Sequence, residues 1–247
     1  MTIDHPAVLA AMGAHLPHRG TRVIERPGWY QVITPGARGA NEVLFSTPDA
    51  DVAAVAAEYT ERFRWCVWPW ADALAAPLAA HGFERHDARA MVAETTLAIA
   101  APGDVTVEEV ATPDQLAVYV ATLAAGWEYR SADRDELAAC LARVLADPAR
   151  AHRFYLAHVD GVPAGTAGLT YRPALDAIYL TGGNVLPPYR GGGVYRALLA
   201  ARLADARGAR LVTTHARAQT SAPILERLGF AIAVAYRVFL STASGSG

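Results

Sequence analysis

The residues with the clearest chemical meaning are one arginine and three consecutive glycines, Arg190-Gly191-Gly192-Gly193. A β-prone apolar run, Ala177 to Leu186, precedes them, and an Ala/Leu-rich run typical of a helix, Val194 to Ala206, follows them. This order predicts a strand, a tight loop and the N-terminus of a helix. The helix dipole and free backbone N–H groups attract anions there, and glycine lets a ligand approach the backbone closely. We therefore predict that the loop binds a phosphate or pyrophosphate.

Two common phosphate loops do not fit the segment. A dinucleotide loop needs spaced glycines near the start of a βαβ unit, and a Walker loop needs a lysine, which the chain lacks. The segment instead resembles motif A of the GNAT acyltransferases, in which a strand ends Val-x-Pro and Arg/Gln-x-x-Gly-x-Gly/Ala opens a helix. Val185-Leu186-Pro187 matches the strand end, and Arg190 to Val194 match the loop. Tyr195 departs from the pattern, because the family has Gly or Ala there.

The resemblance continues over about residues 104 to 240. The ending Leu228-Gly229-Phe230 is similar to the family's motif B. The other elements follow the family order of a strand hairpin upstream and a strand, a short helix and a strand downstream: Phe154–Val159, Ala164–Tyr171, Leu211–His215, Ser221–Leu228 and Ala231–Leu240. The resemblance implies an α/β (α+β) fold, with a mixed, mostly antiparallel sheet whose central strands splay apart and which helices flank.

The N-terminal half repeats part of this pattern. Leu78 to Phe83 parallels Leu225 to Phe230, and Ala-Pro precedes each segment. The order is again strand, helix, strand, helix, predicted at Asn41–Phe45, Asp49–Phe63, Arg64–Trp68 and Asp72–His81. Its loop, Ser46 to Asp49, has no glycine, and Asp49 as a helix N-cap would place negative charge where a phosphate would bind. We interpret this half as a smaller, degenerate GNAT-like unit; the alternative is a coincidental Gly-Phe.

A segment rich in Ala, Pro and Gly suggests the domain boundaries. Ala100 to Asp104 has the composition of a linker. We expect a degenerate domain at residues 1–100, a GNAT domain that binds acyl-CoA at residues 104–241, and a flexible tail at residues 242–247.

The resemblance also suggests an acceptor site. After a strand at Val105–Val110, Thr112 and Pro113 begin a predicted helix that runs to Ala125. A second helix is predicted from Asp133 to Ala146, and in the family the loop between these two helices borders the acceptor. Here the loop contains Trp127, Glu128 and Tyr129, and aromatic rings beside a carboxylate can hold an amine. The alternative is that Gly126 ends the helix and the aromatic side chains pack on the surface.

The resemblance implies direct acyl transfer from acyl-CoA, with acetyl-CoA as the expected co-substrate, to a primary amine of a small molecule or peptide. The backbone near Val185 would hold the pantetheine arm and donate one N–H to the thioester carbonyl. Arg190 and Arg196 would add charge at the pyrophosphate. The predicted cofactor-binding residues are Asn184, Val185, Leu186, Arg190, Gly191, Gly192, Gly193, Val194, Tyr195 and Arg196.

The general base is harder to assign, because the run from Ala177 to Leu186 contains no Asp, Glu or His. Glu128 is our first candidate and His215 the second, although His215 also fits a partly buried histidine at a strand end. Many family members use a tyrosine to protonate the leaving thiolate, at the position that Leu225 occupies here. These departures leave an alternative open, a CoA-binding or regulatory module without catalysis.

Composition limits the remaining possibilities. The chain has 247 residues, is 53% hydrophobic and 19% charged, and carries a net charge of −2. This profile predicts a soluble globular protein without nucleic-acid partners, and no apolar run reaches the roughly 18 residues of a membrane span. Without a signal peptide, we expect a cytoplasmic monomer or homodimer. Cys66 and Cys140 are far apart, and the histidines are scattered, so we predict reduced cysteines and no metal site.

Overall fold

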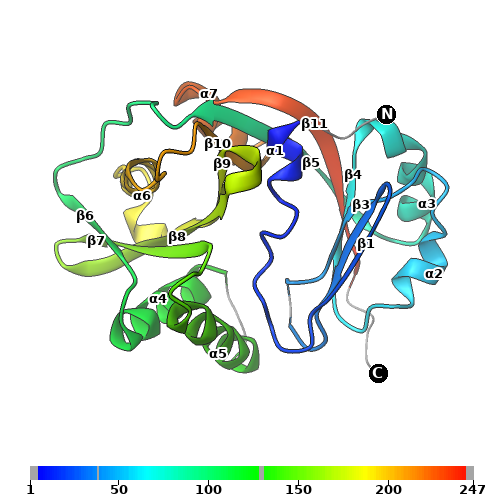
Figure 1. Cartoon of the computed structure of the whole chain (residues 1–247), viewed down its shortest axis with the longest axis horizontal. Coiled ribbons are helices and arrows are strands. Elements are labelled where there is room, and N and C mark those ends of the chain that lie inside the picture. Colours follow the sequence, from blue (N-terminus) through cyan, green and yellow to red (C-terminus); the bar gives the residue numbers. More distant parts are fainter. Residues whose placement is uncertain (1–4, 38, 128–130, 243–247) are drawn as a thin grey trace. The chain divides into compact units, whose positions relative to one another are not determined.

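The computed structural model of the protein describes residues 5–37, 39–127 and 131–242, which fall into two compact units (Figure 1). Unit 1 comprises residues 1–91, 215–227 and 232–247, and unit 2 comprises residues 92–214 and 228–231. The chain therefore passes between the units more than once. The boundaries expected at residues 100 and 104 stay a prediction.

Unit 1 is built on strands in the order β1-β2-β3-β4-β11-β5. Strands β3 and β4 are parallel, whereas β1–β2, β2–β3 and β4–β11 are antiparallel. Its elements are α1 (Pro6–Leu9), β1 (Arg22–Arg26), β2 (Trp29–Ile33), β3 (Glu42–Phe45), α2 (Val52–Ala56), β4 (Arg64–Val67), η1 (Pro69–Leu74), α3 (Ala75–Ala80), β5 (Glu84–Glu94), α7 (Ser221–Arg227) and β11 (Ala231–Leu240).

The core of unit 1 contains side chains from both ends of the sequence. Phe239 of β11 lies opposite Trp65 of β4 and is buried in the same apolar cluster. Ser241, just after β11, accepts hydrogen bonds from the backbone of Phe63 and the side chain of Arg62. Strand β11 therefore completes the core of a unit whose other strands come from the first 94 residues.

Two helices predicted in the N-terminal half are wrong in extent. The predicted helix over 49–63 is only Val52–Ala56, and Asp51 rather than Asp49 caps it by accepting a hydrogen bond from the N–H of Ala54. Beyond it, the Tyr59 hydroxyl donates to the carbonyl of Glu42, and this tertiary bond holds the chain outside the helix. The predicted helix over 72–81 is a 3₁₀ turn followed by α3, because Pro77 has no N–H to continue a regular helix.

Unit 2 has the strand order β10-β9-β8-β7-β6, all antiparallel except the pair β9–β10. Helices α4 and α5 cover one face of this sheet, and α6 covers the other (Figure 1). Its elements are β6 (Val105–Glu109), α4 (Pro113–Trp127), α5 (Ser131–Ala146), β7 (His152–Val159), β8 (Val162–Arg172), η2 (Pro173–Leu175), β9 (Ala177–Val185), η3 (Pro187–Tyr189), α6 (Val194–Ala204) and β10 (Leu211–Arg217). The predicted mixed, mostly antiparallel architecture is confirmed.

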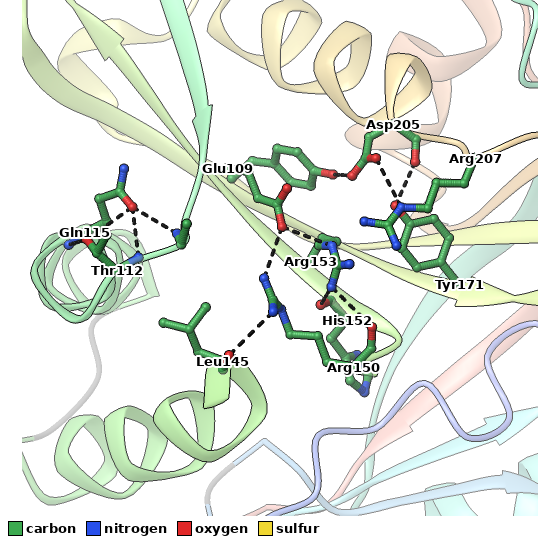
Figure 2. A network of polar contacts seen from close by, with 12 residues as sticks. Glu109, Thr112, Gln115, Leu145, Arg150, His152, Arg153, Tyr171, Asp205 and Arg207 are labelled. Atoms are coloured by element: carbon green, nitrogen blue, oxygen red, sulfur yellow. Dashed lines mark hydrogen bonds and ion pairs between the residues drawn. The ribbon is translucent and has the colours of Figure 1, made fainter. Parts of the chain in front are cut away.

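The N-terminus of α4 begins where the sequence predicts. The Thr112 hydroxyl accepts a hydrogen bond from the N–H of Gln115 at 3.2 Å, and the Gln115 side chain accepts one from the N–H of Thr112 at 3.0 Å (Figure 2). This reciprocal pair is a capping box, which satisfies backbone donors that the first helical turn leaves free. Pro113 occupies the first helical position, where its missing N–H costs nothing.

A polar network fixes the C-terminal end of α6 to the sheet (Figure 2). The Tyr155 hydroxyl donates to the Asp205 carboxylate at 2.6 Å, and the Tyr171 hydroxyl donates to the Asp205 carbonyl at 2.8 Å. Burial raises the pKa of both tyrosines, so their hydroxyls remain protonated donors. Glu109 forms ion pairs with Arg150 and Arg153 in the same network. With this end of α6 anchored, the position of its N-terminus is also restricted.

Candidate active site

Strands β9 and β10 separate partway along their length. Their parallel pairing joins Ala177–Leu180 to Leu211–Thr214 and then stops. The rest of β9, Thr181–Val185, remains paired with β8 but has no pairing on its β10 side. This part of β9 therefore presents an unpaired strand edge, as the predicted splayed strands require.

A bulge lies within the open part of β9. The register pairs Thr166 with Asn184 and Gly168 with Thr181, so two steps along β8 match three steps along β9. The extra residue lies at Gly182–Gly183, and Gly182 has a φ of 60°. A bulge turns the following backbone and side chains toward new directions, and a glycine with positive φ is a usual way to form one. The adjacent glycines inside a predicted strand were the signal for it.

Val185 presents its peptide groups to this open edge. The N–H of Leu186 donates to the carbonyl of Ala164 at 2.9 Å, so that donor is already used within the sheet. Partners alternate along an antiparallel ladder, and Asn184 therefore also faces β8 whereas Val185 faces away from it. Arg190 confirms this direction, because its Nε–H donates to the Val185 carbonyl at 3.1 Å. Of the three backbone N–H groups predicted to bind the cofactor arm, only that of Val185 points to the open edge.

The glycine loop that follows depends on two left-handed residues. Gly191 has a φ of 83° and Gly193 a φ of 85°, a region that other residues rarely adopt. A Cβ on Gly193 would also collide with the Pro102 ring, and it would lie 3.1 Å from Nη2 of Arg196. Gly193 is the N-cap of α6, where no side chain caps the helix and no acidic residue lies in the first turn. The loop therefore combines free backbone donors with two arginines, Arg190 and Arg196.

Tyr195 packs against β9. A Cβ on Gly183 would lie 3.1 Å from the Cε2 atom of the Tyr195 ring, so the ring lies directly over the bulge. Burial raises the pKa of Tyr195, and the nearby Arg202 guanidinium opposes this rise. Arg202 is itself buried, and its Nη1 donates to the carbonyl of Gly168 at 3.2 Å. The side chain that departs from the family pattern thus supports the bulge from the α6 face, and its predicted backbone role stays a prediction.

The predicted acceptor residues are only partly described. Trp127 is the last residue of α4 and is 50% exposed. Glu128 and Tyr129 lie outside the described residues. Gly126 lies inside α4 rather than ending it, and a Cβ there would overlap the side-chain amide of Asn184. The glycine is therefore explained by a close approach between α4 and β9.

The second candidate base, His215, lies in a packed setting in unit 1. Its Nε2–H donates to the carbonyl of Ala7 at 3.1 Å, and its ring lies 5.6 Å from that of Trp68 and 5.3 Å from that of Tyr236. Burial lowers the pKa of His215 to about 4, so the imidazole is neutral at pH 7. Its role as a base stays a prediction. Leu225, at the position of the family tyrosine, is buried and carries no hydroxyl.

Unit 1 contains a second pair of parallel strands that separate, but tryptophans fill the space. Strands β3 and β4 pair only at Glu42–Arg64 and Val43–Trp65. Beyond this point the Trp65 indole N–H donates to the Ser46 hydroxyl at 2.9 Å, and the Trp68 indole N–H donates to the Leu44 carbonyl at 2.6 Å. The Trp68 indole therefore binds a backbone carbonyl of β3, and the Trp65 indole binds the side chain of the residue that follows this strand. The sequence predicts the loss of the glycine loop in this unit, but not these contacts.

The cysteine prediction is confirmed, because Cys66 and Cys140 are buried free thiols. Burial raises the pKa of Cys66 to about 12 and that of Cys140 to about 11. Among the described residues, no group of three or more His, Cys, Asp or Glu side chains could hold a metal ion. In the same part of the chain, no helix combines the length and apolar character that crossing a membrane requires.

Comparisons with known proteins agree with this geometry. A search of curated proteins finds no match. A functionally unknown conserved protein from Staphylococcus epidermidis shares the fold with a TM-score of 0.69 at 14% identity, covering 91% of this chain and 95% of its own. A GCN5-related N-acetyltransferase from Kribbella flavida gives 0.62 at 19% identity, covering 99% and 98%. A tandem GNAT protein from the clavulanic acid biosynthesis pathway gives 0.55 at 18% identity, covering 98% and 89%.

The sequence itself also matches a family profile. The match spans residues 118–230, which include α4, the glycine loop, α6 and the Gly229-Phe230 ending. The splayed strands, the bulge and the glycine loop described above lie within this segment. The family whose model residues 118–230 match is the acetyltransferase (GNAT) family.

Proposed function

We propose that unit 2 is an acyl-CoA-dependent N-acyltransferase, with acetyl-CoA as donor and a primary amine of a small molecule or peptide as acceptor. The observation that supports this proposal most strongly is that the open strand edge and the glycine loop follow each other directly in the sequence. The open edge of β9 ends at Val185, and five residues later Arg190 begins the glycine loop. One short segment thus offers a strand edge for an extended arm and a cationic loop for a pyrophosphate.

Each part of the donor would have its own contacts. Backbone N–H groups from Gly191 to Tyr195 would bind the pyrophosphate oxygens, and Arg190 and Arg196 would add charge-assisted hydrogen bonds. The pantetheine arm would follow the edge of β9. The N–H of Val185 would donate to the thioester oxygen and would bind it more strongly as negative charge develops there.

The transfer requires a neutral amine. Its lone pair attacks the thioester carbon, the C–S bond breaks, and the thiolate of CoA leaves; the product amide nitrogen must lose a proton. We propose Glu128 as the base that takes this proton. His215 is a less suitable candidate, because its Nε2–H is used on the carbonyl of Ala7 and burial lowers its pKa to about 4, which makes it a weaker base than an ordinary histidine. Water would protonate the thiolate, since Leu225 has no proton to donate.

A second candidate function is a CoA-binding or regulatory module without catalysis. Two observations favour it: strand β9 carries no Asp, Glu or His, and Leu225 replaces a possible acid. We also propose that unit 1 is a degenerate GNAT-like unit that binds no CoA. Its strand gap is filled by Trp65 and Trp68, and the tandem GNAT relative in the comparisons covers nearly the whole chain. Each chain would then bind one acyl-CoA.

Thiol release distinguishes the two functions. The protein is incubated with acetyl-CoA and a panel of amines and amino acids, and free CoA is measured with a thiol reagent. Acceptor-dependent release supports the transferase. Tight acetyl-CoA binding without release from any amine supports the non-catalytic module.

A further inference from the structure

Several buried polar groups in unit 2 have no hydrogen-bond partner in the described part of the chain, and two of these groups belong to neutral side chains on neighbouring strands. These two are the hydroxyl of Thr166 and the side-chain N–H₂ group of Asn184, and the two residues are 0% and 7% exposed. Buried polar groups are nearly always paired, because leaving a donor unpaired away from water destabilises the protein. Two such groups at one place therefore call for a functional explanation.

The two groups lie on the same face of the sheet. Thr166 and Asn184 are opposite each other in the β8–β9 ladder, so their side chains project to the same side. That side is not the α6 face, because a Cβ on neighbouring Gly165 would contact Val194 and Leu198 of α6. The Asn184 amide instead lies against Gly126 of α4. Both unpaired groups therefore face α4, the helix that ends at Trp127.

Their position relative to the proposed reaction centre is also specific. Asn184 directly precedes Val185, whose N–H points to the open edge of β9. Consecutive Cα atoms are about 3.8 Å apart, so the amide lies within one residue of the proposed thioester contact. A molecule held by Asn184 and Thr166 on the α4 face would thus place a neighbouring atom close to the thioester carbon.

We propose that Asn184 and Thr166 bind a carbonyl or carboxylate oxygen of the acceptor, which makes the acceptor an α-amino acid or the N-terminus of a peptide. An amide N–H₂ and a hydroxyl are two donors, and an oxygen with two lone pairs accepts from both. In these acceptors the oxygen is three bonds from the amine, a separation of about 3 Å. Gly126 lies against the Asn184 amide in this structure, so we expect binding to move the last turn of α4 away from β9. The proposal rests on the proposed function of unit 2.

Matched acceptors test the oxygen requirement. Alanine with ethylamine, and phenylalanine with phenethylamine, differ only by the carboxylate, and the dipeptide Ala-Ala keeps a carbonyl next to its amine. With acetyl-CoA, we expect thiol release for the amino acids or the dipeptide at a kcat/KM at least tenfold above that of the decarboxylated amines. Equal values within each pair would overturn the proposal.

Apolar replacements test the residues. Thr166→Val and Asn184→Leu preserve shape and remove the donors. Each is expected to raise KM for the acceptor at least tenfold, and Thr166→Val, which lies outside the predicted cofactor-binding residues, is expected to leave the Kd for acetyl-CoA unchanged. An unchanged KM in both variants would contradict the assignment.

Thermal unfolding gives a readout that does not depend on turnover. Because both groups are unpaired, Thr166→Val and Asn184→Leu should keep or raise Tm. Thr170→Val is the matched control on the same strand, because the buried Thr170 hydroxyl is hydrogen-bonded to His152 at 2.9 Å and its loss should lower Tm. A similar fall in Tm for all three variants would show that Thr166 and Asn184 serve only the fold.

Failure of the proposed function gives a different result. If acetyl-CoA binds but no amine releases thiol, unit 2 is not an acyltransferase for the amines tested. The subsite is then judged by whether alanine or Ala-Ala raises the Tm of the acetyl-CoA complex when ethylamine does not, and whether Asn184→Leu removes this shift. The absence of any such shift would overturn the subsite.

Discussion

The indole of Trp68 donates its N–H to the backbone carbonyl of Leu44 at 2.6 Å, beyond the point where β3 and β4 stop pairing. The Trp68 ring also stacks on Tyr236 of β11 at 4.2 Å between ring centroids. In unit 2 the corresponding strand edge leads into the glycine loop, and the side chain that donates to this edge, at the Val185 carbonyl, is that of Arg190. In unit 1 the Trp68 side chain thus covers a strand edge of the kind that we propose as the cofactor site in unit 2.

Replacing Trp68 should open a cavity without creating a cofactor site. Trp68→Ala removes a fully buried ring and should lower the free energy of unfolding by about 3–5 kcal/mol. Added indole should restore part of this loss, measured as a rise in Tm. Calorimetry should still give one acetyl-CoA per chain, because the loop from Ser46 to Asp49 lacks glycine. A second bound acetyl-CoA, in the variant or the wild type, would contradict our interpretation of unit 1.

The glycine loop should be sensitive to single methyl groups. Gly193→Ala places a Cβ against Pro102 at a positive φ, and we expect the Kd for acetyl-CoA to rise at least tenfold. Gly208→Ala is the matched control, because Gly208 has a φ of 81° and no atom within 4 Å of the added Cβ. Each variant should lose about 1 kcal/mol of stability from backbone strain, and Gly193→Ala should lose more. Equal affinities for acetyl-CoA in both variants would refute the loop assignment.

Strand β11 should be essential for unit 1. A chain that ends at residue 230 lacks the strand that pairs with β4, where Val238 lies opposite Cys66. The buried Cys66 thiol should then react rapidly with a thiol reagent, while Cys140 of unit 2 should stay protected. Phe239→Ala is a milder test, with an expected loss of about 3–5 kcal/mol. Protection of both thiols in the shortened chain would show that β11 is dispensable.

Low pH should lower the free energy of unfolding, because His215 must then bind a proton. Its pKa falls from 6.5 to about 4 on folding, so the folded state favours the neutral ring. The stability that this shift contributes is complete above pH 6.5 and is lost as the pH falls toward 4, a change on the order of 3 kcal/mol. His215→Gln retains an N–H donor and does not titrate. Urea unfolding between pH 4 and 7 should therefore show a flatter dependence for the variant, and parallel curves would contradict the assignment.

The candidate bases can be separated by pH profiles. Glu128→Gln should lower kcat at all pH values by about 10²-fold or more, the usual contribution of a general base. His215→Gln should leave the pH dependence of kcat unchanged if the histidine is only structural. An unchanged kcat in the Glu128 variant would exclude it as the base.

Local patterns predict unit 2 well. Its helices and strands follow hydrophobic periodicity, and Thr112, Pro113 and the glycines mark their ends, so the boundaries agree to within a few residues. The candidate loop is equally local, because the glycines act through their own φ values. The unpaired Thr166 and Asn184 are not predictable in this way, since their relation depends on the register between two strands and on the approach of Gly126.

Unit 1 is less predictable because distant residues determine it. The helix expected over 49–63 is shortened by the bond from Tyr59 to the carbonyl of Glu42. The pairing of β11 with β4 joins residues that are more than 160 positions apart, and periodicity carries no information about strand partners. Trp65 and Trp68 can be read from the sequence, but the hydroxyl and the carbonyl to which their indoles donate cannot be predicted from it.

The position of β11 has a consequence for biosynthesis. The first strands of unit 1 leave the ribosome early, but their core cannot close until residues 231–240 have been translated. At roughly 5–20 residues per second, Trp65 of β4 waits about 10–35 seconds for Phe239, its neighbour on β11. During that interval the nascent N-terminal segment exposes apolar strands of the kind that chaperones protect, and unit 2 has all of its own sequence available before unit 1 does.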